Sequence, residues 1–146
     1  MNVLDTSVLV YAVGGDHPKR ESCRRVIASI EEGLLNATTT VEAIQEFIHV
    51  RSRRRSRADA AALGLEYAAL LTPLVAPTAE DLREGVRIFE GSSKIGAFDA
   101  VIAAVAIARG AALISIDNDF ALVDGLEHVD PSSPEFEALL ASKREL

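Results

Sequence analysis

Residues 113–120 read LISIDNDF, a strand-like run that passes directly into two aspartates, Asp117 and Asp119. The preceding segment, AFDAVIAAVAIARG at 97–110, is apolar on nearly every face, which predicts a central buried helix. A buried helix next to a short apolar strand is typical of a parallel sheet covered on both faces. The two aspartates then follow the carboxyl end of a core strand, where they either form a turn and a helix cap or contribute to a metal site.

The same alternation of strands and helices extends in both directions from this segment. Short apolar or β-leaning runs predict strands at 2–5, 35–40, 74–76, 111–116 and, at the edge of the sheet, 126–130. Helical spacing of apolar residues, ended in places by glycine or proline, predicts helices at 6–13, 18–33, 41–55, 58–71, 79–92, 97–110 and 134–143. We therefore expect one domain over residues 1–146, an α/β fold with three layers, α/β/α, around a short central parallel sheet.

The composition indicates a globular protein of the cytoplasm. Hydrophobic residues make up 49% of the 146 residues, enough for a sizeable core. No apolar run reaches the roughly 18 residues that a membrane span needs, and the N-terminus lacks the basic start of a secretion signal. A single cysteine, Cys23, excludes an internal disulfide and fits a reducing compartment. The net charge of −7 means that only a local basic surface would attract a polyanion.

Acidic residues come from several separate segments to the edge of the sheet where the strands end. Asp5 follows the first predicted strand, and Asp99 lies in the first turn of the buried helix. Glu42 and Glu46 are four residues apart in the helix after ATTT, so they share one helix face. Because the carboxyl ends of parallel strands meet at one edge, we expect these acids to lie close to the two aspartates of LISIDNDF.

Most of these acids also have a purely structural interpretation. Asp5 could cap the helix that follows it, Asp117 could cap a turn, and Glu42 could favour a helix N-terminus. Asp99 is harder to explain in this way because its helix is otherwise apolar, and an unpaired buried carboxylate is costly. Carboxylates about 5 Å apart repel by roughly 3 kcal/mol at an effective dielectric constant of about 20, so a cluster must share protons or hold a cation. No His, Cys or Lys joins the cluster, which favours Mg²⁺ or Mn²⁺ over zinc.

Four stretches of the sequence carry a family resemblance: VLDTSVLVYA (3–12), TTTVEAIQEF (38–47), GAFDAVIAAVA (96–106) and LISIDNDF (113–120). Together and in this order they resemble the PIN-domain nucleases, and within them the VapC-type toxins of bacterial type II toxin–antitoxin systems. The likeness covers essentially the whole chain. It implies a metal-dependent endoribonuclease toxin that leaves 5′-phosphate and 3′-hydroxyl ends. It also implies a homodimer and a cognate VapB-type antitoxin that blocks the acidic cleft with a basic side chain.

The resemblance also implies roles for individual residues by their position. It places catalytic acids at Asp5, Glu46, Asp99 and Asp117, and ligands for Mg²⁺ or Mn²⁺ at Asp5, Asp99, Asp117 and Asp119. Glu46 is preferred to Glu42 because QEF fits the family pattern better than VEA, and its implied task is to position or deprotonate the attacking water. Thr6 is expected to orient the first acid. Ser115 stands where relatives often have threonine, which implies contact with a water or a phosphate.

An arginine-rich run, RSRRRSR at 51–57, lies at the end of the predicted helix that carries the two glutamates. The run itself contains no acidic residue. We interpret this run as a surface that contacts phosphates, with RNA contacts at Arg51 and Arg54 in addition to Thr6 and Ser115. The alternative is a solvated helix end whose cations complement the helix dipole. Aromatic residues are 5% of the chain, so base stacking is not expected to be the main mode of recognition.

Other functions that place an aspartate after the first strand fit less well. An aspartate-nucleophile phosphatase would need a second aspartate two residues after Asp5, where this chain has Ser7. A response-regulator receiver would need a phosphoacceptor aspartate after a central strand and a lysine near a later strand end, and neither is found. A non-catalytic RNA- or protein-binding domain remains the alternative, and it would tolerate Asp99→Asn.

Overall fold

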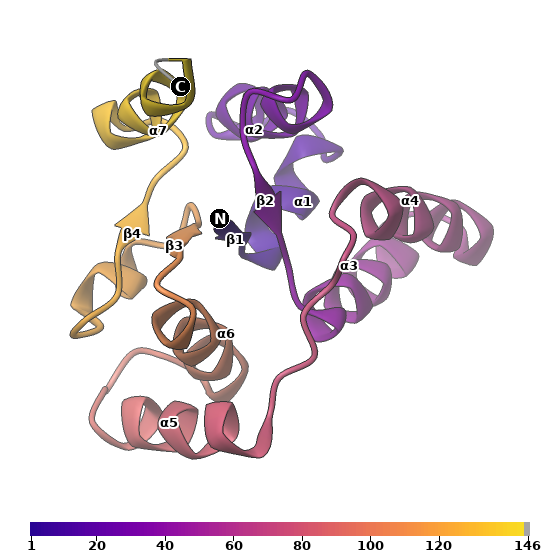
Figure 1. Cartoon of the computed structure of the whole chain (residues 1–146). Coiled ribbons are helices and arrows are strands. Elements are labelled where there is room, and N and C mark those ends of the chain that lie inside the picture. The colour runs from indigo at the N-terminus through magenta and orange to yellow at the C-terminus, as the bar shows by residue number, and fades with distance from the viewer. Residues whose placement is uncertain (145–146) are drawn as a thin grey trace.

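The chain folds around a short, fully parallel sheet (Figure 1). The computed structural model describes residues 1–144. Its four strands lie in the order β2-β1-β3-β4, and every neighbouring pair is parallel. Their bounds are Asn2–Leu4 (β1), Ala37–Thr38 (β2), Ala112–Ile114 (β3) and His128–Val129 (β4). Because β1 is central, Val3 pairs with Thr38 on one side and Leu113 on the other, which confirms the predicted short central sheet.

Helices cover both faces of the sheet, which confirms the predicted α/β/α layers. In Figure 1, α1, α2 and α7 lie on one side, while α6 lies on the other side with α5 packed against it. The remaining pair, α3 and α4, pack against each other, and α3 also contacts α1. The helix bounds are Thr6–Ala12 (α1), Arg20–Glu31 (α2), Val41–Arg54 (α3), Arg57–Leu70 (α4), Ala79–Glu90 (α5), Ala97–Ala108 (α6) and Pro134–Arg144 (α7).

Side chains of the two central strands alternate between two hydrophobic cores. Val3 and Leu113 pack on the small side chains of α6, which allow this helix to lie close to the sheet. Leu4 and Ile114 point the other way and pack with residues of α1, α2 and α7. This alternation is what a strand buried on both faces requires, and it explains why the strands are apolar at consecutive positions.

The three consecutive threonines after β2 begins fix the start of α3 relative to the rest of the sheet. Thr38 Oγ1 donates to the carbonyl of Leu71 at 2.9 Å, and Thr39 Oγ1 donates to the carbonyl of Leu4 at 2.7 Å. Thr40 caps α3 by accepting a hydrogen bond from the backbone N–H of Ala43 at 3.1 Å. The bond to Leu4 is made one residue before Asp5, so it holds α3 against the end of β1.

One local prediction from the sequence differs from the structure. The strand predicted at 74–76 is wrong, because this segment forms only one isolated bridge, between Thr40 and Val75. Pro73 and Pro77 flank it and lack the N–H that a longer ladder would use. After β3, the chain forms a short 3₁₀ helix, η1 (Asn118–Leu122), at the place where the sequence allowed a turn and a helix cap.

The helices that the structure describes are too short for a membrane span. Across residues 1–144, no helix combines the length and apolar character needed to cross a membrane. The most apolar one, α6, has 12 residues and is buried against the sheet.

Candidate active site

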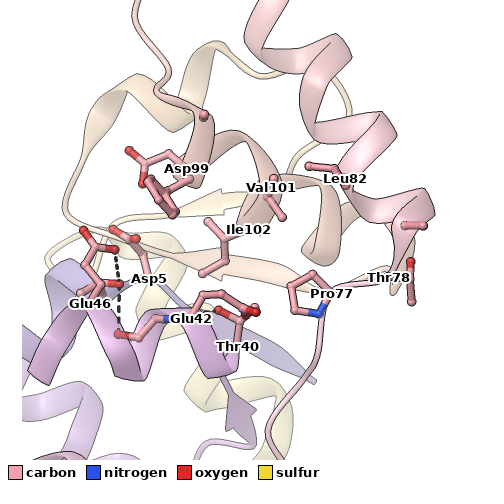
Figure 2. Close-up of a pocket in the computed structure, with 15 residues that line it drawn as sticks. Asp5, Thr40, Glu42, Glu46, Pro77, Thr78, Leu82, Asp99, Val101 and Ile102 are labelled. Carbon is pink, nitrogen blue, oxygen red and sulfur yellow. Dashed lines mark hydrogen bonds between the residues drawn. The ribbon is translucent and has the colours of Figure 1, made fainter. Parts of the chain in front are cut away.

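A pocket of about 460 Å³ lies beside the end of β1, between α3, α5 and α6 (Figure 2). Its acidic lining comes from Asp5, Glu42, Glu46 and Asp99. In Figure 2, Asp5, Glu46 and Asp99 gather at one end of the pocket. Its apolar lining includes Pro77, Leu82, Phe98, Val101 and Ile102. The structure thus brings together acids from the end of β1, from α3 and from α6, as the sequence predicts for the sheet edge.

Asp5 is a buried carboxylate that hydrogen-bonds to two serines. The residue is only 6% exposed. Its Oδ2 atom accepts hydrogen bonds from Ser7 Oγ and Ser115 Oγ, both at 2.7 Å. Asp5 occupies the N-cap position of α1, but its side chain makes no capping hydrogen bond. The capping interpretation is therefore wrong for Asp5. Ser7 was not predicted, although its place in the Asp-Thr-Ser run next to a candidate acid was a usable signal.

Ser115 connects the ends of the two central strands. Its hydroxyl donates to Asp5 and also accepts a hydrogen bond from the backbone N–H of Asp117 at 3.0 Å. Ser115 has no exposed surface, which contradicts the contact with RNA that was predicted for it. Its effect on the site is indirect, because it sets the orientation of one acid and the start of the loop that carries another.

Glu46 is held by Thr6, across the interface between α3 and α1. Thr6 Oγ1 donates to Glu46 Oε2 at 3.0 Å, with a longer contact of 3.5 Å to the carbonyl of Ala43 (Figure 2). Thr6 therefore orients Glu46, rather than Asp5 as the sequence analysis expected. Glu42 also lines the pocket, but it has no such anchor from α1 among the described residues. The geometry thus supports the preference for Glu46 over Glu42.

Asp99 lies in the first turn of α6 and is partly buried. Burial raises its pKa from 3.8 to about 7, and the next causes are the negative charges of Asp5, Glu46, Asp117 and Asp119. Glu42 is not among these charges. Carboxylates from three other segments of the chain therefore act on Asp99, which is the convergence that the sequence predicts.

Asp117 and Asp119 are not among the residues that line the pocket, although their charges act on Asp99. Asp117 caps η1, because its Oδ1 accepts a hydrogen bond from the backbone N–H of Asp119 at 2.9 Å. The turn-and-cap interpretation of this segment is therefore correct. It is compatible with a second role, because both carboxylates still contribute to the raised pKa of Asp99.

The donor atoms around the pocket are all oxygens from carboxylates and hydroxyl groups, which is the chemistry that Mg²⁺ and Mn²⁺ prefer. Over the part of the chain that the structure describes, no group of three acidic, histidine or cysteine side chains is already arranged to hold an ion. The electrostatics nevertheless fit a cation. Burial and then the neighbouring carboxylates raise the pKa of Asp99, and a positive charge among these groups would offset their repulsion.

The predicted RNA-contacting arginines differ in their surroundings. Arg51 is half-buried, and its guanidinium binds Asp59 at 2.6 Å and the carbonyl of Val13 at 3.0 Å. These contacts join α3, α4 and the end of α1, and they weigh against the RNA contact predicted for Arg51. Arg54 is exposed.

The fold and the acidic pocket agree with the family to which the sequence is matched. The model of the PIN domain family matches residues 3–126, so the chain belongs to this family. The chain is 46% identical to Ribonuclease VapC7 of Mycobacterium tuberculosis, a match that covers 98% of this chain and all of the relative.

Solved structures share the fold at lower sequence identity. VapC20 of Mycobacterium tuberculosis, described as a sarcin–ricin loop cleaving toxin, matches with a TM-score of 0.70 at 17% identity, over 84% of this chain and 94% of that one. A toxin–antitoxin complex from Klebsiella pneumoniae matches with a TM-score of 0.66 at 17% identity, over 91% of this chain and 99% of that one. At these identities the likeness demonstrates the shared fold.

Proposed function

We propose that the chain is a Mg²⁺- or Mn²⁺-dependent endoribonuclease, the toxin of a toxin–antitoxin pair, with catalytic acids Asp5, Glu46, Asp99 and Asp117. The observation that carries the proposal is the convergence of carboxylates from separate segments on Asp99, whose pKa is raised to about 7 by burial and, after that, by their negative charges. Hydrolysis of RNA is further supported by the identity of 46% over nearly the full length to a protein named as a ribonuclease.

Each acid has a distinct place in the proposed reaction. Ser7 and Ser115 hold Asp5 in one orientation, so that its second oxygen can face the pocket. Glu46, exposed and anchored by Thr6, is placed to orient the attacking water and accept its proton.

The ion would be held by Asp5, Asp99 and Asp117, with Asp119 beside them. When bound, it would supply Lewis-acid stabilisation of the negative charge that develops on the scissile phosphate and on the leaving oxygen. The residues on the apolar side of the pocket would exclude water from one side of the bound strand. The expected products carry 5′-phosphate and 3′-hydroxyl ends.

The proposed partner is a VapB-type antitoxin that occupies the same pocket. The pocket combines acids with two exposed apolar side chains, Leu82 at 54% and Phe98 at 80% exposure. In a protein segment with one basic residue and neighbouring apolar residues, the basic residue would pair with the acids and the apolar residues would cover Leu82 and Phe98. We also propose a homodimer, because Leu82, Val86 and Phe89 form an exposed apolar row at helical spacing along α5.

The direct test incubates the purified protein with total RNA in Mg²⁺ or in EDTA and maps the new 5′ ends. Cleavage should require the metal and should be lost in Asp5→Asn and Asp99→Asn. Glu42→Gln is the matched control, since Glu42 lines the same pocket but is not one of the main charges that raise the pKa of Asp99, and this variant should cut. If Asp99→Asn cuts as well as wild type, the alternative of a non-catalytic domain with a contaminating nuclease is favoured.

A further inference from the structure

Four neighbouring arginines form an exposed surface at the junction of α3 and α4: Arg53, Arg54, Arg55 and Arg57, called the arginine surface below. None of the four forms an ion pair with an acid in the part of the chain whose side chains the structure describes. Asp59, the nearest acid in sequence, is bound to Arg51. By contrast, the other arginines with described side chains, from Arg20 on α2 to Arg109 after α6, each pair with an acid. On a chain with a net charge of −7, this surface is a local concentration of uncompensated positive charge.

Helix stability accounts for only part of this charge. Arg53 and Arg54 lie in the last turn of α3, where cations interact favourably with the helix dipole. Arg57 is the first residue of α4, and at a helix N-terminus a positive charge is unfavourable. Arg57 therefore carries a positive charge where that charge lowers helix stability. This favours binding of an anionic ligand as the reason for an arginine at this position.

The arginine surface continues the exposed face of α3 that begins at the candidate active site. Glu46, His49 and Arg53 are spaced at i, i+3 and i+7, so they lie along one face of the helix, and all three are exposed. The rise per residue separates Glu46 from Arg53 by about 10 Å, roughly three steps of a stacked nucleic-acid strand at about 3.4 Å each. A strand with one phosphate at the acids would therefore bring later phosphates to the arginines.

A second cavity lies beside this face and adds polar groups to it. It has a volume of about 510 Å³ and is lined by Gln45, Ile48, His49, Ser52, Arg57 and Ala61. The lining contains an amide, an imidazole, a hydroxyl and a guanidinium, which are donors that suit phosphate and sugar oxygens. No acid lines this cavity among the described residues.

We propose that the arginine surface, with the adjoining cavity between α3 and α4, binds the phosphodiester backbone of the substrate RNA on one side of the scissile bond. This inference rests on the proposed ribonuclease function and adds a substrate-binding site to it. The ligand is a polyanion with regularly spaced charges, because the acids and the arginines lie along one helix face and a continuous strand can reach both. Such contacts position RNA without reading its sequence.

The test measures RNA binding by salt titration in the Asp99→Asn background, so that the probe stays intact. The probe is a fluorescein-labelled single-stranded RNA of mixed sequence. Loss of two phosphate contacts in Arg53→Gln/Arg57→Gln should lower the slope of log Kd against log salt by about 1.4, since each contact on a single strand contributes about 0.7. Between 50 and 200 mM salt, the variant should therefore lose about sevenfold less affinity than its parent.

Two matched variants separate this effect from a general change of charge. Arg24→Gln/Arg25→Gln removes the same charge from α2, where both arginines are paired with Glu21 and Glu137, and should keep the parental slope. Arg53→Lys/Arg57→Lys keeps the charge and should retain most of the slope.

The proposal is overturned if the Gln variant keeps the parental slope, or if both Gln variants lose it equally. It is also overturned if the Gln variant binds RNA normally but no longer binds poly-glutamate, since the surface would then recognise an acidic protein segment. These results do not depend on cleavage, so they are distinct from failure of the ribonuclease assignment.

Discussion

Replacing Asp99 with asparagine should stabilise the metal-free protein at neutral and alkaline pH while removing its activity. Burial and the surrounding carboxylates raise the pKa of Asp99 from 3.8 to about 7 in the folded state. The folded protein therefore holds this proton more tightly than the unfolded chain does. Below about pH 4 both states are protonated and the carboxyl has no effect, whereas stability is lost as the pH rises from about 4 through 7.

The size of the effect follows from the shift. A pKa unit corresponds to about 1.4 kcal/mol, so a shift of about three units sets an upper limit of roughly 4 kcal/mol. Because Asp99 is only partly buried, solvent screening reduces this to about 2 kcal/mol. In a chain of this length that gain raises the unfolding temperature by roughly 4–8 °C.

The assay compares urea unfolding of wild type and Asp99→Asn in EDTA at pH 4 and pH 8. The variant should be more stable by about 2 kcal/mol at pH 8 and equally stable at pH 4. Glu42→Gln should change little at either pH, because Glu42 is not one of the main charges that raise the pKa of Asp99. If Asp99→Asn is no more stable than wild type at pH 8, the view that Asp99 is buried among other negative charges is refuted.

Three further predictions concern the residues that support the site. Ser115→Ala leaves the buried carboxylate beside it with one donor fewer, so stability should fall by about 1–3 kcal/mol and cleavage should slow at saturating RNA. Gly85→Ala should lower urea stability by about 1–3 kcal/mol, because its Cβ would lie 2.8 Å from Val101 Cγ2, whereas the open Gly15→Ala should be neutral. Cys23 is fully buried, which raises its pKa to about 12, so a thiol reagent should label it only as fast as the chain opens.

The sequence predicts the central elements of the fold because these segments consist almost entirely of apolar residues, which predicts that they are buried. The helix at 97–110 is apolar all round, and the structure places α6 against the sheet with Ala100 and Ala103 fully buried. Asp5 and Asp99 line one pocket because β1 ends and α6 begins at the same edge of the sheet, which depends only on topology. These features need no knowledge of side-chain orientation.

Side-chain partners could not be predicted in the same way. The bond from Ser115 to Asp5 depends on the register that pairs Leu4 with Ile114, which no local pattern specifies. The role expected for Thr6, to orient Asp5, was wrong because its hydrogen-bond partner Glu46 lies on another helix, whose packing the sequence does not specify.

The arginine run illustrates the same limit. Its composition is evident from the sequence, but which arginine is engaged depends on how α3 and α4 cross. Arg51 faces Asp59 on α4, while Arg53 and Arg57 remain exposed without a described ion-pair partner.

The most direct test of the proposed site is Mn²⁺ binding, measured by isothermal titration calorimetry at pH 7.5. The account predicts saturable binding to wild type and to Glu42→Gln, and binding at least about tenfold weaker in Asp99→Asn and Asp5→Asn. Equal Mn²⁺ affinity in wild type and Asp99→Asn, or no saturable binding at millimolar metal, would contradict the claim that these carboxylates together hold a divalent cation.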